Sequence, residues 1–385
     1  MSRRILIVPD KFKGTLTARQ AAVAIAAGWS SVHPGDTLHC IPMSDGGDGF
    51  GSVLEGALEA IHQTTATLDS AGRPRISDWW WAPGRSVAVI ETAQTIGLAL
   101  LPHGQFHPFQ LDTFGIGAVL RDAVASGARD CWVGIGGSST NDAGFGLARS
   151  LGWRFLDSQG NEIRRWTKLT RLIRVLPPTE PLQAKCRFTV AVDVDNPLLG
   201  PTGCSRIYGP QKGLRPEDMI EAEAALEALA KVLREHLGRD IALIPGSGAA
   251  GGLGFGLQAF LDARVESGFE IFARASDLDR HMAWADLVLT GEGSLDRQSL
   301  MGKGTGRVAA RARQHGRPCY GLAGMVEPLA SGETSLFTLS RAIVPDLAPV
   351  EAAKAEAAHW LEELARQVAP MAPTRGACGG VQGGA

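Results

Sequence analysis

Short apolar runs alternate along the chain with longer segments in which apolar residues recur every three or four positions. The runs at 5–8, 37–43 and 131–135 are mostly apolar and predict strands. The segment 217–237 has leucines on one helical face, acids near its start and basic residues near its end, which is typical of a helix. The alternation predicts an α/β fold with a mostly parallel sheet. Further strands are predicted at 64–68, 87–92, 188–194, 241–244, 287–290 and 319–323, and further helices after Thr17, at 116–124, at 305–315 and at 350–367.

Length and charge narrow the function classes. The 385 residues correspond to about two domains. With 38 Lys and Arg against 40 Asp and Glu, the net charge is −2, so no global field favours nucleic acid or an anionic membrane. The apolar runs are far shorter than a secretory signal or a membrane span requires, and the six cysteines form no CxxC motif. We therefore expect a cytoplasmic protein with neither a nucleic-acid nor a membrane partner.

Glycine is abundant, with 48 residues, and much of it follows predicted strands. Glycine lets the backbone approach a ligand closely, and backbone amides at such turns and at helix N-termini bind phosphate. In an open α/β sheet these turns gather at the carboxyl edge of the strands, where ligands bind. Five segments have this character: 9–14, 44–49, 134–146, 245–256 and 290–304.

Acidic side chains stand in the same kind of position. Asp193 and Asp195 alternate at the end of a predicted strand, so both side chains leave on one face. Two neighbouring carboxylates suit Mg²⁺ or a carboxylate base, although an Asx turn that ends the strand is the alternative. Asp45 with Asp48 and Glu292 with Asp296 repeat the arrangement, and lysines lie in similar contexts at Lys11, Lys13, Lys212 and Lys303. Carboxylates, lysines and glycine-rich turns in one cleft predict phosphoryl transfer.

Other readings of the sequence remain open at this point. Residues 246–251 form a literal GxGxxG string, which alone would indicate a dinucleotide-dependent oxidoreductase. A sensor that binds a small acid without catalysis is a third class, and the paired acids argue against it. The GxxxxGK[ST] pattern of a P-loop does not occur, so any phosphate is held by another cradle.

The order of the motifs resembles that of the type I glycerate kinase family. The motifs are PDKFKGT, SDGGDG, GGSSTNDAGFG, DVDNPLLGPTG with GPQKG, PGSGAAGGLG and LTGEGSLDRQSLMGK, and the resemblance spans about residues 4–365. It implies ATP-dependent phosphorylation of D-glycerate to 2-phosphoglycerate with Mg²⁺, in a cleft between two α/β domains. The implied Rossmann-like or flavodoxin-like parallel-sheet domain comprises 1–63 and 278–370, the inserted second domain 64–277, and the tail 371–385.

The chain departs from the usual family pattern at several positions. Lys11 and Thr15 replace two serines, and Ser294 replaces the arginine of GEGRLD. If that arginine contacts phosphate, then Lys11, Arg297 or Lys303 supplies the charge here. The SDGGDG motif differs from the usual ADGGEGT at Ser44, Asp48 and Phe50, and GGSSTNDAG from GGSATNDGG.

We assign roles on the residues and the resemblance together. Asp193 accepts the proton of the glycerate 2-hydroxyl, with Lys13 and Glu292 as further catalytic groups, and Asp195 with Asp193 holds Mg²⁺. Which glycine-rich loop serves which ligand stays open, as do formation of 3-phosphoglycerate and a homo-oligomer. Substrate contacts are assigned to Asp10, Lys11, Asp45, Asn141, Asp142, Lys212 and Asp296, and nucleotide contacts to Gly136, Gly137, Ser138, Gly246, Gly248, Gly251 and Lys303.

Overall fold

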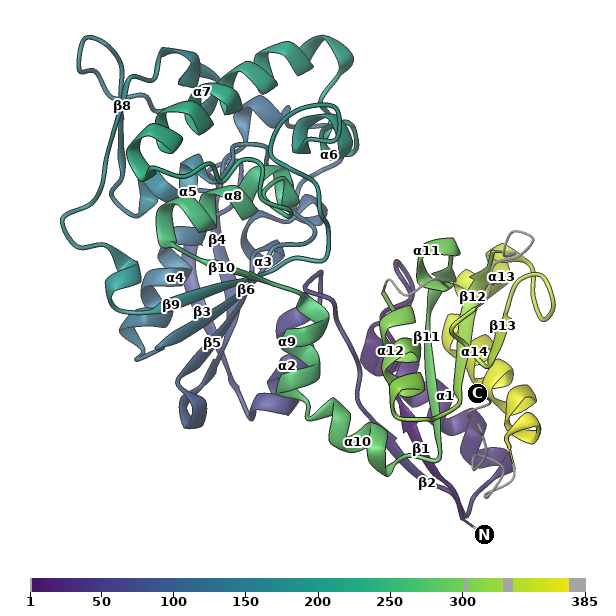
Figure 1. Ribbon diagram of the computed structural model, residues 1–385. Helices are drawn as coiled ribbons and strands as arrows, with labels where there is room; N and C mark the ends of the chain where they lie inside the picture. The colour runs from purple at the N-terminus through teal and green to yellow at the C-terminus, as the bar shows by residue number, and fades with distance from the viewer. Residues whose placement is uncertain (1, 301–303, 328–334, 374–385) are drawn as a thin grey trace, which may run out of the picture. The chain divides into compact units, whose positions relative to one another are not determined.

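The computed structural model describes residues 2–300, 304–327 and 335–373 (Figure 1). The chain divides into two compact units, each with its own sheet. The first unit comprises Met1–Ser44 and Phe272–Ala385, so both chain ends contribute to it, and the second unit is the intervening segment Asp45–Ile271. The expected α/β architecture with an inserted second sheet is confirmed.

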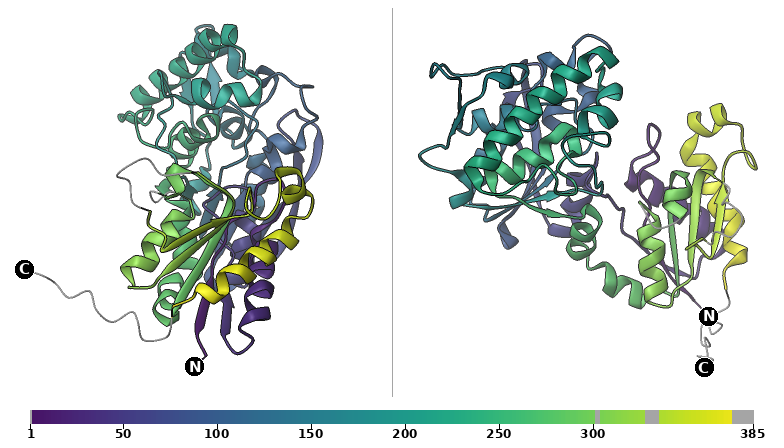
Figure 2. Two further views of the ribbon diagram at one scale, coloured as in Figure 1. Left: turned by 90° about the vertical axis from the view of Figure 1, so that its right-hand side faces the viewer. Right: turned by 45° about the horizontal axis from the view of Figure 1, so that its top comes forward.

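The sheet of the first unit is wholly parallel, in the order β13-β12-β11-β1-β2. Helices α1 and α14 pack together, and a Cβ atom on Gly28 would lie 2.1 Å from the carbonyl oxygen of Glu362. Figures 1 and 2 show α12 on the opposite face of the sheet from these two helices. The elements are β1 Arg4–Ile7, α1 Ala18–Val32, β2 Thr37–Cys40, α10 Leu278–Trp284, β11 Leu287–Leu295, α11 Arg297–Leu300, α12 Gly306–Gln314, β12 Cys319–Val326, β13 Leu339–Ala342, α13 Val350–Ala355 and α14 Ala357–Val368.

The sheet of the second unit has the order β10-β9-β6-β5-β4-β3, in which β10, β9, β6 and β5 are mutually parallel. Strands β4 and β3 are antiparallel and form one edge. Strands β7 (Arg154–Leu156) and β8 (Arg174–Leu176) pair separately. The remaining elements are α2 Phe50–Leu58, β3 Ile61–Leu68, β4 Pro74–Ala82, β5 Val87–Glu91, α3 Ala93–Ile96, α4 Ile116–Ala125, β6 Asp130–Gly134, α5 Phe145–Ser150, β9 Arg187–Ala191, α6 Cys204–Lys212, α7 Met219–Leu237, α8 Ala249–Leu261, β10 Arg264–Glu266 and α9 Gly268–Ala275.

Helix α2 belongs to the second unit because it packs against β4 and β5. A Cβ atom on Gly51 would lie 1.8 Å from the ring of Trp80, so the helix rests directly on that indole. The compact units therefore group residues 45–63 with the second sheet, whereas the sequence-based division placed them with the first domain. The domain bounds predicted from the sequence remain a prediction.

Most predicted elements are present, and one is wrong. Helix α1 begins with the predicted capping box, in which Thr17 accepts from the amide of Gln20 and the Gln20 side chain accepts from the amide of Thr17. The predicted strand at 241–244 does not exist. Ile241 and Ala242 are buried in a hydrophobic cluster, but the chain then turns and leaves Leu243 73% exposed. No helix within the described residues combines the length and apolar character needed to cross a bilayer.

Candidate functional site

The carboxyl ends of four parallel strands in the second unit carry polar residues and glycines. Strand β5 ends at Glu91, β6 leads into Gly136, β9 leads into Asp193, and β10 leads into Ser267. Strand polarity places these positions at one edge of the sheet, which is where open α/β sheets bind ligands.

Residues 45–49, which we call the 45–49 loop, pack on this edge with almost no space between backbones. The amide of Gly136 donates to the carbonyl oxygen of Gly46 at 3.3 Å. A Cβ atom on Gly136 would lie 2.6 Å from the Cα of Gly47, and one on Gly268 would lie 2.0 Å from the carbonyl oxygen of Asp45. Glycine is required at these positions because backbone passes backbone. The predicted close approach therefore exists, and its partner here is the chain itself.

Asp193 is fixed in place from the neighbouring strand end. Its Oδ1 accepts from the Ser267 hydroxyl at 2.7 Å, and its Oδ2 accepts from the amide of Phe269 at 3.3 Å, in the first turn of α9. Both contacts stabilise the ionised carboxylate and set its orientation. Asp195 is exposed, and β9 ends at Ala191, so the strand alternation expected to direct the two acids together does not extend to them.

A third carboxylate at this edge, Glu91, was missed by the sequence analysis. Its side chain is 2% exposed, and its two oxygens accept from the amides of Gly49 at 2.9 Å and Gly51 at 3.2 Å. Burial raises the pKa of Glu91, and these hydrogen bonds oppose that rise. The available signal was the same one that identified Asp193: an acid directly after the apolar run 87–90.

The segment Gly136–Ser138 joins this edge to the interior of the unit. Gly137 is exposed with φ +73°, and a Cβ atom on it would lie 2.1 Å from Oδ1 of Asp48. Within the described residues, the amides of Gly137 and Ser138 donate no hydrogen bond, whereas the amide of Ser139 donates to the carbonyl oxygen of Ile96. Two adjacent free amides are a feature that phosphate-binding turns share.

The polar residues after this segment are buried. Asn141 is fully buried; its Nδ2 donates to the Ser205 hydroxyl at 2.9 Å, and its Oδ1 has no partner among the described residues. Lys212 is 6% exposed, and its ammonium donates to the carbonyl oxygen of Thr140 at 2.6 Å. Burial lowers the pKa of Lys212 to about 8.

Asp142 is also fully buried, and its contacts are structural. Its Oδ2 accepts from the amide and hydroxyl of Thr113 at 2.9 and 2.8 Å and from the amide of Gly146 at 2.9 Å. Burial, with a smaller contribution from Asp112, raises the pKa of Asp142 to about 6. Asp142 thus fixes the start of α5, and its predicted substrate contact remains a prediction.

The glycines of the GxGxxG string lie in the interior. A Cβ atom added to Gly246 would lie 2.8 Å from Cγ1 of Val192. One added to Gly248 would lie 2.1 Å from the carbonyl oxygen of Pro197, and one added to Gly251 would lie 1.9 Å from the carbonyl oxygen of Thr140. Because residues 241–244 are not a strand, the string also lacks the strand–turn–helix context of a dinucleotide site. Close packing accounts for these glycines, and the string no longer supports the oxidoreductase interpretation; their predicted nucleotide contacts remain a prediction.

The first unit brings a second group of predicted residues together at the carboxyl ends of its neighbouring strands β1 and β11. The amide of Asp10 donates to the carbonyl oxygen of Gly291 at 2.8 Å, and the amide of Lys11 donates to Oδ1 of Asp10 at 2.7 Å. Lys13 is exposed, and a Cβ atom on Gly293 would lie 3.4 Å from its backbone nitrogen. These residues therefore border the strand that carries Glu292.

Glu292 and Asp296 differ in their surroundings. Glu292 accepts from the Thr305 hydroxyl, and burial raises its pKa against the effect of that bond. Oδ1 of Asp296 accepts from the amide of Ser299 at 2.8 Å, as a residue that caps a helix does. The predicted nucleotide contact of Lys303 falls outside the described residues.

The donors for Mg²⁺ are few. Within the described residues, no group of three or more His, Cys, Asp or Glu side chains is arranged to hold a metal ion. Mg²⁺ in kinases is commonly held by one or two carboxylates together with substrate phosphates, so a single exposed carboxylate such as Asp195 fits this mode.

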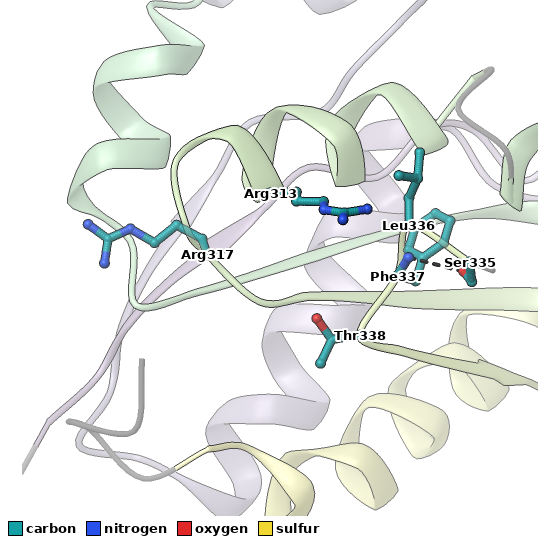
Figure 3. Close-up of a pocket in the computed structure, with 6 residues that line it drawn as sticks. All are labelled: Arg313, Arg317, Ser335, Leu336, Phe337 and Thr338. Carbon is teal, nitrogen blue, oxygen red and sulfur yellow. Dashed lines mark hydrogen bonds between the residues drawn. The ribbon is translucent and has the colours of Figure 1, made fainter. Parts of the chain in front are cut away.

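A separate pocket in the first unit lies at the amino end of strand β12 and contains none of the predicted residues (Figure 3). Figure 3 shows the Arg317 side chain directed away from Arg313, and its Nη2 donates to the carbonyl oxygen of Ala283 at 2.7 Å. The pocket is lined by Arg313, Arg317, Ser335, Leu336, Phe337 and Thr338.

Comparison with known proteins gives one consistent family. The sequence profile described as "Glycerate kinase family" matches residues 5–372. The chain is 38% identical to a glycerate kinase of Halalkalibacterium halodurans, covering 95% of this chain and 97% of that protein. It is 36% identical to the glycerate 2-kinase of Escherichia coli K12, and the match covers 83% of this chain and 85% of that protein. A crystal structure from Salmonella typhimurium LT2 that carries the name glycerate kinase 2 superposes with a TM-score of 0.82 at 32% identity, covering 96% and 98%.

Proposed function

Because the chain belongs to the glycerate kinase family, we propose that it transfers the γ-phosphoryl group of ATP to the 2-hydroxyl of D-glycerate. The products are 2-phospho-D-glycerate and ADP. Kinase chemistry on glycerate follows from the family. The family alone does not specify which hydroxyl is phosphorylated. The name of the E. coli relative, glycerate 2-kinase, supports the 2-hydroxyl.

The observation that carries the proposal is the fixed carboxylate of Asp193. The Ser267 hydroxyl and the Phe269 amide hold it in one orientation at the carboxyl edge of the sheet. A positioned carboxylate accepts the proton of the attacking hydroxyl as the phosphoryl group arrives, as a general base does in phosphoryl transfer. The 2-hydroxyl oxygen forms the new P–O bond, the bond between the γ-phosphorus and the β,γ-bridging oxygen breaks, and ADP leaves.

Basic side chains neutralise the two anions of the reaction. We assign Lys13 to the moving phosphoryl group, because it is exposed on a loop of the first unit that borders β11. Lys11 and Asp10 precede it on the same loop and contact glycerate. In the second unit, Lys212 orders the segment around Asn141 through Thr140, which supports a role in shaping the glycerate site. Removing a positioned charge from such a site should lower kcat, because a kinase accelerates its reaction mainly by positioning and electrostatic stabilisation.

The nucleotide phosphates are assigned to Gly136, Gly137 and Ser138, since two amides of that turn are free of partners within the described residues. Mg²⁺, when bound, neutralises charge on the phosphate oxygens, and Asp195 with Asp193 would hold it. Glu292 is a partly buried carboxylate whose pKa burial raises, and we keep it as a further catalytic group at the end of β11. We place the reaction in the cytoplasm, and it is compatible with a homo-oligomer.

One assay tests the proposal. Purified protein is incubated with ATP, Mg²⁺ and D-glycerate, ADP is measured, and the phosphoglycerate isomer is identified by ³¹P NMR. We expect ADP and 2-phosphoglycerate in equal amounts. Formation of 3-phosphoglycerate would keep the kinase and remove the regiochemistry. Glycerate binding without ADP formation would instead indicate the non-catalytic sensor.

A further inference from the structure

Two cysteines of the second unit lie side by side, although they are far apart along the chain. Cys131 is the second residue of β6, and Cys186 directly precedes β9. Their sulfur atoms are 3.4 Å apart, which is a hydrogen-bonding distance for two thiols. Cys131 is 0% exposed and Cys186 4%, and both belong to the apolar cluster on one face of the sheet. Among the cysteines that the structure describes, they are the only two whose sulfur atoms are in contact.

The pairing of the two strands brings these thiols together. Strands β6 and β9 are adjacent and parallel, with Asp130 opposite Arg187, and these two side chains form an ion pair at 2.7 Å. Cys131 follows Asp130 and Cys186 precedes Arg187, so both cysteine side chains leave on the other face of the sheet. The thiols therefore meet wherever the β6–β9 ladder is formed.

The sulfur atoms are close enough to form a disulfide after a small movement. An S–S bond is about 2.05 Å long, so the two sulfurs must approach each other by about 1.4 Å. Cys186 can make this movement, because β9 begins only at Arg187 and Cys186 itself lies outside the ladder. A disulfide that requires such an adjustment carries strain, and strained disulfides are readily reduced again.

Cys186 is the thiol that an oxidant reaches first. It lies between two exposed residues, Lys185 and Arg187, whereas Cys131 lies within its strand. The contact with the Cys131 thiol lowers the pKa of Cys186, the charge of Arg187 acts in the same direction, and burial opposes both. The thiolate is the form of cysteine that attacks an oxidant, so this environment favours attack by Cys186.

We propose that Cys131 and Cys186 form a reversible oxidation site, at which a hydroperoxide converts the two thiols into a disulfide that joins β6 to β9. The Cys186 thiolate attacks one peroxide oxygen, the O–O bond breaks, and Cys186 becomes a sulfenic acid. The Cys131 sulfur then attacks the Cys186 sulfur, the S–S bond forms, and the hydroxyl group leaves with the Cys131 proton as water. With hydrogen peroxide, the thiols lose two electrons and two protons, and the peroxide becomes two molecules of water.

The disulfide closes a loop within the second unit. Its ends are 55 positions apart, and a cross-link over such a span restricts the unfolded chain. Both cysteines lie at the amino ends of their strands, whereas Asp193 follows the carboxyl end of β9, so the cross-link forms at the edge opposite the candidate site. A thiol that enters a disulfide also avoids the irreversible sulfinic and sulfonic acids. Oxidation at this site therefore protects the fold of the unit and can be reversed.

The test treats the whole protein with hydrogen peroxide and locates the products by peptide mapping without reduction. We expect the peptides that contain Cys131 and Cys186 to be joined, with the loss of the mass of two hydrogen atoms, and to separate after treatment with dithiothreitol. The midpoint of thermal unfolding should rise by about 5 °C on oxidation and return on reduction, because the closed loop lowers the entropy of the unfolded chain.

Single alanine variants distinguish the two sulfurs. In Cys131→Ala, peroxide should leave a sulfenic acid on Cys186 that dimedone traps, whereas Cys186→Ala should give no adduct on Cys131. Neither variant should show the rise in the unfolding midpoint. Cys204→Ala is the matched control, because Cys204 is a fully buried thiol of the same unit without a cysteine in contact among the described residues. It should form the disulfide and show the same rise as wild type.

The wild-type peptide map decides the outcome even if a variant does not fold. Both thiols unmodified after peroxide treatment, Cys186 converted to a sulfinic acid without a cross-link, or a disulfide of either cysteine with another partner would each overturn the oxidation site. These measurements do not depend on turnover of glycerate, so a failure of the kinase proposal leaves them unaffected.

Discussion

Two glycine-rich segments of the second unit have opposite surroundings. Gly136–Ser138 follows strand β6 at the carboxyl edge of the sheet, exposes Gly137, and has two amides without partners within the described residues. Gly246–Gly251 follows an exposed turn, but its glycines are buried, and each faces another stretch of chain at a distance that excludes a Cβ atom. The difference teaches that a glycine-rich turn at the strand edge can leave backbone amides without partners, whereas the glycines of the interior segment are enclosed by backbone packing.

The strongest test of the edge is Asp193→Asn. The amide keeps an oxygen that can accept from Ser267 or Phe269, but it does not accept the substrate proton, so kcat should fall by about 10²–10⁴. The midpoint of thermal unfolding should change little, because the side chain is only partly buried. Steady-state ADP release measures the change in kcat, and a thermal melt measures the unfolding midpoint. Turnover near the wild-type rate would remove the base assignment.

A substitution in the interior segment Gly246–Gly251 should lower the stability of the protein and leave its activity largely unchanged. In Gly251→Ala the new Cβ would lie 1.9 Å from the carbonyl oxygen of Thr140, and φ is +69°, a region that disfavours alanine. Overpacking and backbone strain together should lower the free energy of unfolding by about 3 kcal/mol. Urea denaturation measures the loss, and kcat per folded molecule should stay near wild type. A stable variant that had lost nucleotide binding would instead return this segment to the ligand site.

The contrast also shows what the sequence could and could not predict. The capping box at Thr17 and Gln20, the helix 219–237 and the strand before Asp193 depend on local pattern, and all three are present. The strand at 241–244 was wrong because a run of four apolar residues also fits a turn, in which Ile241 and Ala242 are buried and Leu243 is exposed. Local pattern does not report which backbone lies opposite a glycine.

Site residues could likewise be predicted only where a local pattern in the sequence marks them. Asp193 could be identified because it directly follows an apolar run, and the same signal was available for Glu91. The burial of Lys212 and Asp142 could not be read from the sequence, because Lys212 contacts Thr140 and Asp142 contacts Thr113, partners that are distant along the chain. Charged residues near glycine predicted ligand contacts for these two; the structure shows them bonded inside the unit, and their substrate contacts remain predictions.

Gly137→Ala gives the matched edge variant for Gly251→Ala. Its φ is +73°, close to that of Gly251, but the nearest obstacle is the end of an exposed side chain, Oδ1 of Asp48, and not backbone. The free energy of unfolding should therefore fall by only about 1 kcal/mol, the cost of a left-handed alanine. If the turn holds phosphate, the KM for ATP should rise about tenfold while the KM for glycerate stays constant. Equal changes in both KM values would contradict a phosphate role.

The smallest expected effect is a pH dependence from the interior. Burial lowers the pKa of Lys212 from 10.5 to about 8, so between these values the unfolded chain binds more protons than the folded one. The free energy of unfolding contributed by this group must then rise with pH across that window, by about 1 kcal/mol between pH 8 and 9. Lys212→Met keeps most of the apolar side chain and removes the titrating group. The free energy of unfolding of the wild type minus that of the variant, measured by urea denaturation, should therefore become more positive as the pH rises over this interval. A difference independent of pH would show that the ammonium of Lys212 reaches solvent or a counter-charge in the folded protein, and the contrast between a dry interior and a ligand-binding edge would then no longer hold at Lys212.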